Sequence, residues 1–126
     1  MLDCAFDHQL FVLLEAFDEE DLDRTSTFLE RPKYQDLAQS GQLLVGVNTR
    51  NLRSLAVDPD RLAQLAARLP AARCVAESGL LTGQDAASAA ELGYHLALVG
   101  SALMRSDDPA ALVAEMRAAG SARIAA

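Results

Sequence analysis

Apolar and polar positions follow one another in four similar blocks along the chain. Each block opens with a short apolar run that ends in a polar turn, and a segment with helical spacing of apolar residues follows. Runs this short and this apolar are typical of strands buried on both faces, as in parallel sheets. The repeated order predicts an α/β fold of parallel strands alternating with helices, joined by right-handed crossovers. The predicted strands lie near residues 11–17, 43–48, 73–77 and 96–100.

Local signals place several helix boundaries. Asp58 and Asp108 are each followed by a proline, which predicts an N-cap and the first helical residue. Gly120 is predicted to end the last helix, because glycine is favoured just beyond a helix C-terminus. Pro32 is predicted to end or kink the helix before it.

The polar residues of interest stand at or just after the carboxyl ends of the four apolar runs. In a (β/α)8 barrel these ends converge on one rim, where catalytic residues lie. One carboxylate at a strand end can belong to a structural ion pair, but two carboxylates and an arginine at equivalent places indicate a site. The candidate residues are Glu15, Asn48, Arg50, Glu77, Ser78, Gly79, Gly100 and Ser101.

Two kinds of chemistry are expected at these positions. Glu15 follows four apolar residues, so its carboxyl group should be partly desolvated, which raises its pKa and suits a general acid or base. Gly79 and Gly100 lie in turns that lead into helix starts, where backbone N–H groups and the helix dipole favour an anion. The alternative is that these glycines serve turn geometry alone. We favour phosphate binding, because two such turns occur in adjacent units.

Composition narrows the classes of function. The 126 residues are about half of the ~250 in a complete (β/α)8 barrel, and 51% are hydrophobic, enough for a packed core. A net charge of −7 without a basic run argues against nucleic acid as a partner. No apolar run approaches the ~20 residues of a membrane span and no signal peptide opens the chain, so we expect a cytoplasmic protein without a membrane partner. Neither Cys4 nor Cys74 has metal or redox spacing, and no metal site is expected.

Four motifs resemble the indole-3-glycerol-phosphate synthase family, barrel enzymes of tryptophan synthesis. ESGLLTGQD from Glu77 and LVGSALMRSDDP from Leu98 resemble the end of the family's sequence. GVNTRNL from Gly46 resembles its sixth-strand motif, and LLEAFDEEDL from Leu13 its fifth. Between these two motifs residues 31–42 depart from the family, which joins its fifth helix to its sixth strand more directly. We therefore expect a surface insertion there, away from the site, since surface loops tolerate added residues. This resemblance implies the C-terminal (β/α)4 half of a TIM (β/α)8 barrel, as a single domain over residues 1–126.

The resemblance also implies roles for the candidate residues. Glu15 matches the fifth-strand glutamate that acts as a base during ring closure and dehydration, and Glu77 matches a supporting glutamate on the seventh strand. Asn48 and Arg50 match groups that orient the substrate, and the planar guanidinium suits a carboxylate. The match to the phosphate cradle comprises Ser78, Gly79, Gly100 and Ser101, with Ser78 also in the substrate-binding set.

Other groups of the family site have no match here. The family carries a catalytic lysine on its third strand and a further lysine and glutamate on its first strands, whereas the sole lysine of this chain is Lys33, in the expected insertion. The complete enzyme closes and decarboxylates carboxyphenylamino-deoxyribulose 5-phosphate, and no cofactor is implied. We therefore expect a truncated carboxy-lyase that is inactive alone. Its expected partners are a phosphorylated small-molecule substrate and either a second copy or a complementing N-terminal half.

Two other interpretations stay open at this point. The chain could be a non-catalytic half-barrel module that binds phosphorylated ligands or only self-associates. It could also be a small doubly wound α/β domain that has refolded without its other half. The missing lysines favour a module, and the motifs favour the enzyme.

Overall fold

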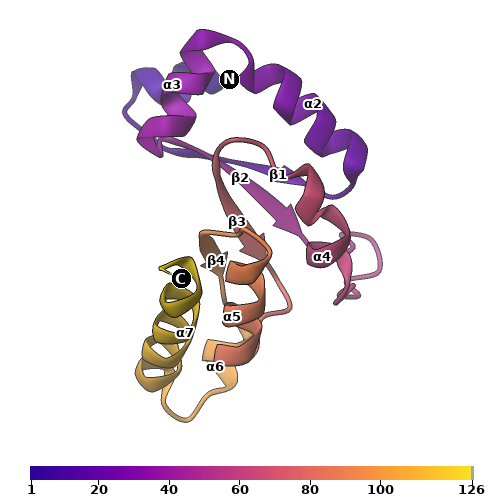
Figure 1. The fold of residues 1–126 in the computed structure, drawn as a ribbon, viewed down its shortest axis with the longest axis vertical. Coiled ribbons are helices and arrows are strands. Elements are labelled where there is room, and N and C mark those ends of the chain that lie inside the picture. Colours follow the sequence, from indigo (N-terminus) through magenta and orange to yellow (C-terminus); the bar gives the residue numbers. More distant parts are fainter. Residues whose placement is uncertain (126) are drawn as a thin grey trace.

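The computed structural model describes residues 1–125, which form one four-stranded parallel sheet in the order β1-β2-β3-β4 (Figure 1). The strands are β1 (Val12–Ala16), β2 (Leu43–Asn48), β3 (Arg73–Glu77) and β4 (Leu96–Leu98). The helices are α1 (Leu2–Asp7), α2 (Glu19–Leu29), α3 (Pro32–Ser40), α4 (Arg61–Leu65) with the 3-10 turn η1 (Ala66–Arg68), α5 (Gly83–Glu91), α6 (Ser101–Arg105) and α7 (Pro109–Ile124). The predicted fold class is confirmed: four parallel strands alternate with helices, as in half of a (β/α)8 barrel.

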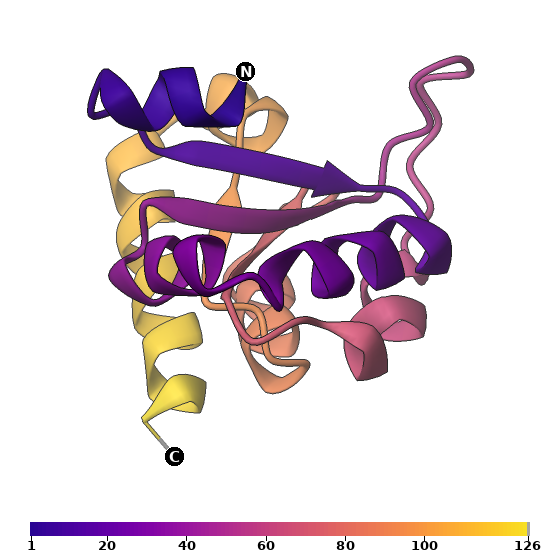
Figure 2. The same ribbon diagram turned by 90° about the horizontal axis from the view of Figure 1, so that it is seen from above.

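One face of the sheet carries the hydrophobic core. The parallel register places Leu14, Val45 and Cys74 side by side, and because side chains alternate between faces, residues two positions along share that face. The two residues on the inner strands are at most 1% exposed. Helices of the first three units cover this face with Leu22, Leu29, Ala38, Leu65 and Ala89. Figure 2 shows α2 and α3 together on one side of β1 and β2.

Within the described residues no helix layer of this kind covers the opposite face. Its outer strand β4 presents Leu96 and Leu98, which are 44% and 51% exposed. At the other edge Phe11, just before β1, is 69% exposed. The expectation that all four strands are buried on both faces is therefore wrong for β1 and β4. It holds best for β3, which is buried from Cys74 to Glu77 because it has a strand on each side.

Two helix boundaries differ from those predicted. Asp58 does not cap α4; its Oδ1 accepts a hydrogen bond from Asp60 N at 3.1 Å, and this local turn delays the helix to Arg61. The last helix continues through Gly120 to Ile124. A methyl group at Gly120 would lie 3.6 Å from the Ala86 carbonyl, so this glycine lies at the close packing of α7 along α5. Tertiary contact outweighs the local stop signal there.

Residues 31–42 are more than a surface insertion. They contain α3, whose Ala38 is 2% exposed and whose Tyr34 and Leu37 pack against the core. The Tyr34 ring stacks on Phe28 of α2 with centroids 4.0 Å apart. This segment is an integral helix of the covered face.

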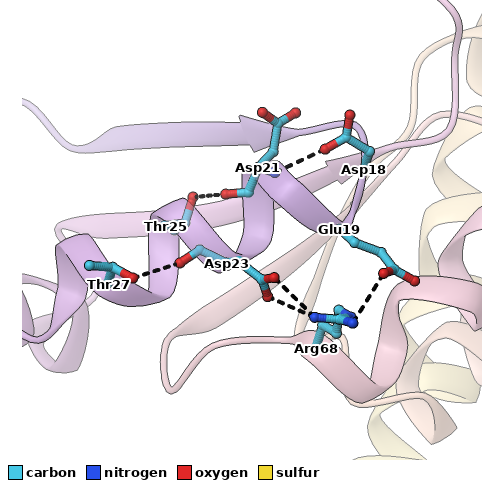
Figure 3. A network of polar contacts seen from close by, with 7 residues as sticks. All are labelled: Asp18, Glu19, Asp21, Asp23, Thr25, Thr27 and Arg68. Atoms are coloured by element: carbon cyan, nitrogen blue, oxygen red, sulfur yellow. Dashed lines mark hydrogen bonds and ion pairs between the residues drawn. The ribbon is translucent and has the colours of Figure 1, made fainter.

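The exposed polar groups of α2 tie it to the next unit (Figure 3). Arg68 Nη1 lies 3.0 Å from both carboxylate oxygens of Asp23, and its Nη2 lies 3.1 Å from Glu19 Oε2. Exposed ion pairs of this kind contribute about 0–1 kcal/mol each. They fix the position of η1 against α2 but contribute little to the stability of the fold. No helix within residues 1–125 is long and apolar enough to cross a bilayer.

Candidate active site

The sheet register brings three candidate residues to the open face, at the carboxyl ends of their strands. Asn48 of β2 pairs with Glu77 of β3, and Glu15 of β1 pairs with Gly46 of β2. Since residues 46 and 48 lie on the same face of β2, the side chains of all three candidates project from that face. The predicted rim of polar groups forms on three adjacent strands.

Glu77 lies buried against the backbone of β2. Its side chain is part of a residue only 3% exposed, and its Oε1 has no hydrogen-bond partner within residues 1–125. A Cβ placed on Gly46 would lie 1.6 Å from this oxygen and 2.8 Å from Cδ. Gly46 has no side chain, and the Glu77 carboxyl group occupies the space that a side chain there would fill. This position is next to the strand that carries Glu15.

This environment changes the acidity of Glu77. Burial disfavours the charged form, the nearby Glu15 carboxylate adds repulsion, and together they raise the pKa of Glu77 to about 7. A carboxyl group with this pKa can hold or release a proton near neutral pH. Glu15, which the sequence indicated as the desolvated acid, is exposed instead. Gly46 is the residue that distinguishes the environments of the two glutamates. Its effect can be recognised only once the strand register is known.

Asn48 and Arg50 shape the turn after β2. Asn48 Oδ1 accepts a hydrogen bond from Arg50 N at 2.9 Å, and Arg50 Nη1 donates to the Leu55 carbonyl at 2.9 Å. Arg50 also forms an isolated antiparallel bridge with Val57, which folds the loop between them back on itself. The arginine is therefore held at the edge of the site by its own loop.

Thr49 is a structural member of this turn that sequence reasoning missed. It is 2% exposed, and its backbone N and Oγ1 both donate to the Glu77 carbonyl, at 3.0 and 3.1 Å. These bonds join the end of β2 to the end of β3 beside the candidate acid. A short polar residue between two candidates gave no separate signal in the sequence.

The turn after β3 needs its glycine. Ser78 and Gly79 both have left-handed backbone conformations, with φ of 67° and 79°. A Cβ on Gly79 would also lie 3.0 Å from Val57 Cγ1. A non-glycine residue with positive φ, such as Ser78, costs about 1–3 kcal/mol and is concentrated at functional sites. Turn geometry accounts for Gly79.

The turn after β4 does not need its glycine. Gly100 has a φ of −119°, which any residue adopts, and no atom of residues 1–125 lies within 4 Å of a Cβ built there. Ser101 follows as the first residue of α6. Neither its φ nor close packing requires glycine at position 100, and the space beside it is open.

Most of the candidate residues line a cleft of about 790 Å³. It does not include Glu15 or Asn48 among its lining residues, but it adds Arg105, at the end of α6, which sequence reasoning missed. A chain with a net charge of −7 needs local positive charge to bind an anion. This requirement could have indicated Arg105. Six predicted residues line the cleft: Arg50, Glu77, Ser78, Gly79, Gly100 and Ser101.

A second cavity, of about 470 Å³, lies between α5, β4 and α7. Its lining is mostly apolar and contains none of the predicted site residues. Within residues 1–125 no group of three His, Cys, Asp or Glu side chains could hold a metal ion. Of the two cavities, only the cleft beside β3 and β4 is lined by candidate residues.

Comparison with known proteins gives a consistent result. The sequence model of the indole-3-glycerol phosphate synthase family matches residues 1–116. The indole-3-glycerol phosphate synthase of Acinetobacter baumannii is 40% identical over 106 residues, which are 83% of this chain and 35% of the relative. That of Azospirillum brasilense is 42% identical over 110 residues, 86% of this chain and 37% of the relative. The chain spans little more than a third of the length of these relatives.

A solved structure has a similar fold. A chain in the crystal structure of the Amycolatopsis orientalis BexX/CysO complex superposes with a TM-score of 0.53. The match covers 86% of this chain and 50% of that one, at 23% sequence identity. At this identity the likeness concerns the fold alone.

Proposed function

This chain belongs to the indole-3-glycerol phosphate synthase family, and we propose that it carries the phosphate-binding half of that enzyme's active site together with two of its glutamates. The family's reaction is a carboxy-lyase reaction that closes the indole ring of carboxyphenylamino-deoxyribulose 5-phosphate with loss of carbon dioxide and water. The observation that carries the proposal is the cleft in which Glu77, two arginines and two glycine turns meet.

In this proposal the four strands are the last four of a (β/α)8 barrel. The phosphate site of such barrels usually lies in the loops after the seventh and eighth strands, with a short extra helix. The turns at Ser78 and Gly100 follow β3 and β4, which are neighbours in the sheet, and the five-residue α6 follows the second turn. The order of the motifs and the place of the cleft both support this assignment.

The substrate phosphate would lie between these two turns. Backbone N–H groups of the turns are its natural donors, and Gly100 leaves space that a side chain would fill. Arg50 and Arg105 line the same cleft and supply positive charge to a chain that is acidic as a whole. Asn48 and Arg50 would orient the rest of the substrate from the end of β2.

The two glutamates would divide the proton transfers. Glu15, exposed on the open face, acts as the base toward the substrate. Glu77, with a pKa of about 7, holds a proton that it can exchange near neutral pH, and its charge state changes the field at Glu15. Burial over Gly46 gives Glu77 this property, so the supporting glutamate has a physical reason to differ from its neighbour.

The family's catalytic acid has no counterpart here. The only lysine, Lys33, lies in the first turn of α3, where its Nζ is 2.7 Å from Asp3 Oδ1 of α1 and not in the cleft. Losing a positioned acid–base group typically costs ~10²–10⁴-fold in rate, and losing substrate-orienting groups costs more. This absence favours a second candidate function for the chain alone, a non-catalytic module that binds phosphorylated ligands.

Two measurements test the proposal. Titration with inorganic phosphate, followed by amide NMR, should shift Ser78, Gly79, Gly100 and Ser101 together. Arg105→Gln should weaken that binding, whereas the control Arg53→Gln, in the exposed loop after β2, should not. Absence of shifts in both turns at high phosphate concentration would contradict phosphate binding.

The enzymatic part of the proposal needs an assay of its own. The purified chain should produce no indole-3-glycerol phosphate. Mixed with a separately made first half of the Acinetobacter baumannii enzyme, it should turn over, and Glu15→Gln should abolish that turnover. Turnover by the chain alone that depends on Glu15 would show that the missing lysine is dispensable.

A further inference from the structure

Thr49 is almost completely buried between the ends of β2 and β3, and it is 2% exposed. Its backbone N–H and its Oγ1 both donate to the Glu77 carbonyl, at 3.0 and 3.1 Å, and its own carbonyl accepts from Asp58 N at 2.9 Å. A carbonyl oxygen has two lone pairs, and two donors that use both of them fix the direction of the C=O bond. The peptide unit after Glu77 is therefore held more firmly than the sheet ladder alone would hold it.

The direction of this carbonyl determines where the next N–H group points. The peptide unit between Glu77 and Ser78 is planar and trans, so the Ser78 N–H is directed opposite to the Glu77 carbonyl. The carbonyl faces Thr49, on the β2 side of β3. The Ser78 N–H accordingly faces the other side of β3, where β4 and the turn at Gly100 lie. Ser78 and Gly100 both line the cleft.

The turn that contains this N–H group needs support from its surroundings. Ser78 and Gly79 have φ of 67° and 79° in succession, and a left-handed conformation at a non-glycine residue persists only where the neighbouring structure enforces it. A Cβ on Gly79 would lie 3.0 Å from Val57 Cγ1 and 3.3 Å from Thr49 Oγ1. Both atoms belong to the chain segment after β2. This segment therefore sets the shape of the turn after β3.

We propose that Thr49 is a positioning residue for anion binding: its hydroxyl group holds the Glu77 carbonyl and thereby directs the Ser78 N–H into the cleft. Thr49 is not among the residues that line the cleft, so it acts through the turn and not on the anion. The inference rests on the proposed phosphate site. The alternative is a hydroxyl group that contributes to stability alone.

Titration with inorganic phosphate, followed by amide NMR, tests the proposal. Thr49→Val keeps the branched shape and removes the hydroxyl donor. It should raise the dissociation constant for phosphate roughly three- to tenfold, the fold-change that corresponds to one ordinary hydrogen bond. At saturating phosphate its Ser78 amide should shift less than that of the parent, whereas the amides of Gly100 and Ser101 should shift as before. Thr49→Ser retains the donor and should bind phosphate like the parent.

Thr25→Val is the matched control. Thr25 Oγ1 donates to the Asp21 carbonyl at 2.8 Å within α2 (Figure 3). The control also removes a hydroxyl-to-carbonyl bond of a partly buried threonine, but in a helix outside the cleft, so phosphate affinity should stay unchanged. Circular dichroism of each variant establishes that it is folded. If Thr49→Val does not fold, Thr49→Cys replaces it and should weaken binding in the same direction, because a thiol is only a weak donor.

The possible results separate this inference from the proposed function. A parent that binds phosphate and a Thr49→Val variant that binds it equally well overturn the positioning role and leave the phosphate site standing. A loss in Thr49→Ser as large as that in Thr49→Val also overturns it, because packing and not the hydroxyl group would then matter. An equal loss in Thr25→Val assigns the effect to stability and overturns it as well. A parent that binds no phosphate contradicts the proposed function, and the inference fails with it.

Discussion

The two faces of the sheet are built from the same four strands and have opposite chemistry. The covered face carries Val45, Val47, Cys74 and Ala76, all at most 1% exposed and packed beneath helices. The open face carries carboxyl and amide groups at the strand ends, with Leu98 beside them. Successive side chains of a strand point to opposite faces. Apolar residues that stabilise the core therefore alternate with residues on the face of the candidate site. Most of the core volume and the polar groups of the candidate site therefore lie on opposite faces of the sheet.

The largest effect should come from deleting core volume on the covered face. Leu43→Ala removes a side chain with 0% exposure from the start of β2 and should cost about 2–5 kcal/mol of unfolding free energy. Leu98→Ala removes the same atoms from a residue 51% exposed on the open face, and should cost less than about 1 kcal/mol. Urea unfolding of the two variants and the parent measures both costs. Equal costs would contradict the division between the faces.

The second effect has the opposite sign and comes from the open face. The pKa of Glu77 is about 7 in the folded chain, against an ordinary value of 4.5, so the folded state binds the proton more tightly. The stability contributed by this group is present below about pH 4.5 and is lost as pH rises through 7. Glu77→Gln should therefore stabilise the chain at pH 8, by about 1–3 kcal/mol.

Urea midpoints at pH 5 and pH 8 check this prediction. The parent should lose stability between the two values, and Glu77→Gln should remove most of that loss. Glu30→Gln, at the exposed end of α2, is the control and should retain the slope of the parent. If the stability of the parent rises from pH 5 to pH 8, the buried Glu77 carboxyl group does not determine its pH dependence.

A third change tests why Glu77 differs from Glu15. Gly46→Ala places a methyl group within 1.6 Å of the present position of Glu77 Oε1, so the carboxyl group must leave its buried position. Once it reaches water, the pKa of Glu77 should fall toward its ordinary range. The cost in stability should be about 1–2 kcal/mol, because the displaced atoms are the end of a flexible side chain. Carbon-detected NMR of the Glu77 carboxyl group across pH gives the pKa; an unchanged value would exclude Gly46 as its cause.

The sequence was sufficient for the features that local patterns determine. Four apolar runs gave the four strands within one or two residues at each end, and Asp108 caps α7 as predicted, its Oδ1 accepting from Ala111 N at 2.9 Å. Family motifs gave the candidate residues before any geometry was known. These features depend on neighbours in the chain, which a sequence displays directly.

What the sequence could not give depends on neighbours across the sheet. Glu15 and Glu77 both follow apolar residues. Only the register shows that the Glu77 carboxyl group lies in the space beside Gly46. The exposure of β4 follows from the absence of a further layer among the described residues, which apolar composition alone cannot indicate. Gly120 likewise continues a helix because of α5, far from it in sequence.

The smallest effect on stability should come from Gly100→Ala. The residue has an ordinary φ of −119° and no atom of residues 1–125 within 4 Å of the position that the new methyl group would take, so the unfolding free energy should change by less than about 0.5 kcal/mol. Phosphate binding should nevertheless weaken several-fold, because the methyl group enters the space left for the anion. Urea unfolding and the phosphate titration by NMR measure the two effects on one sample.

Gly79→Ala is the contrasting variant on the neighbouring strand. Its φ of 79° and the 3.0 Å approach to Val57 Cγ1 should make alanine cost about 1–3 kcal/mol. One glycine would then be required by the fold and the other by the ligand, although both follow a strand in the same way. If Gly100→Ala binds phosphate as tightly as the parent, Gly100 is an ordinary turn residue. The anion site would then be confined to the turn at Ser78 and Gly79, with the arginines of the cleft.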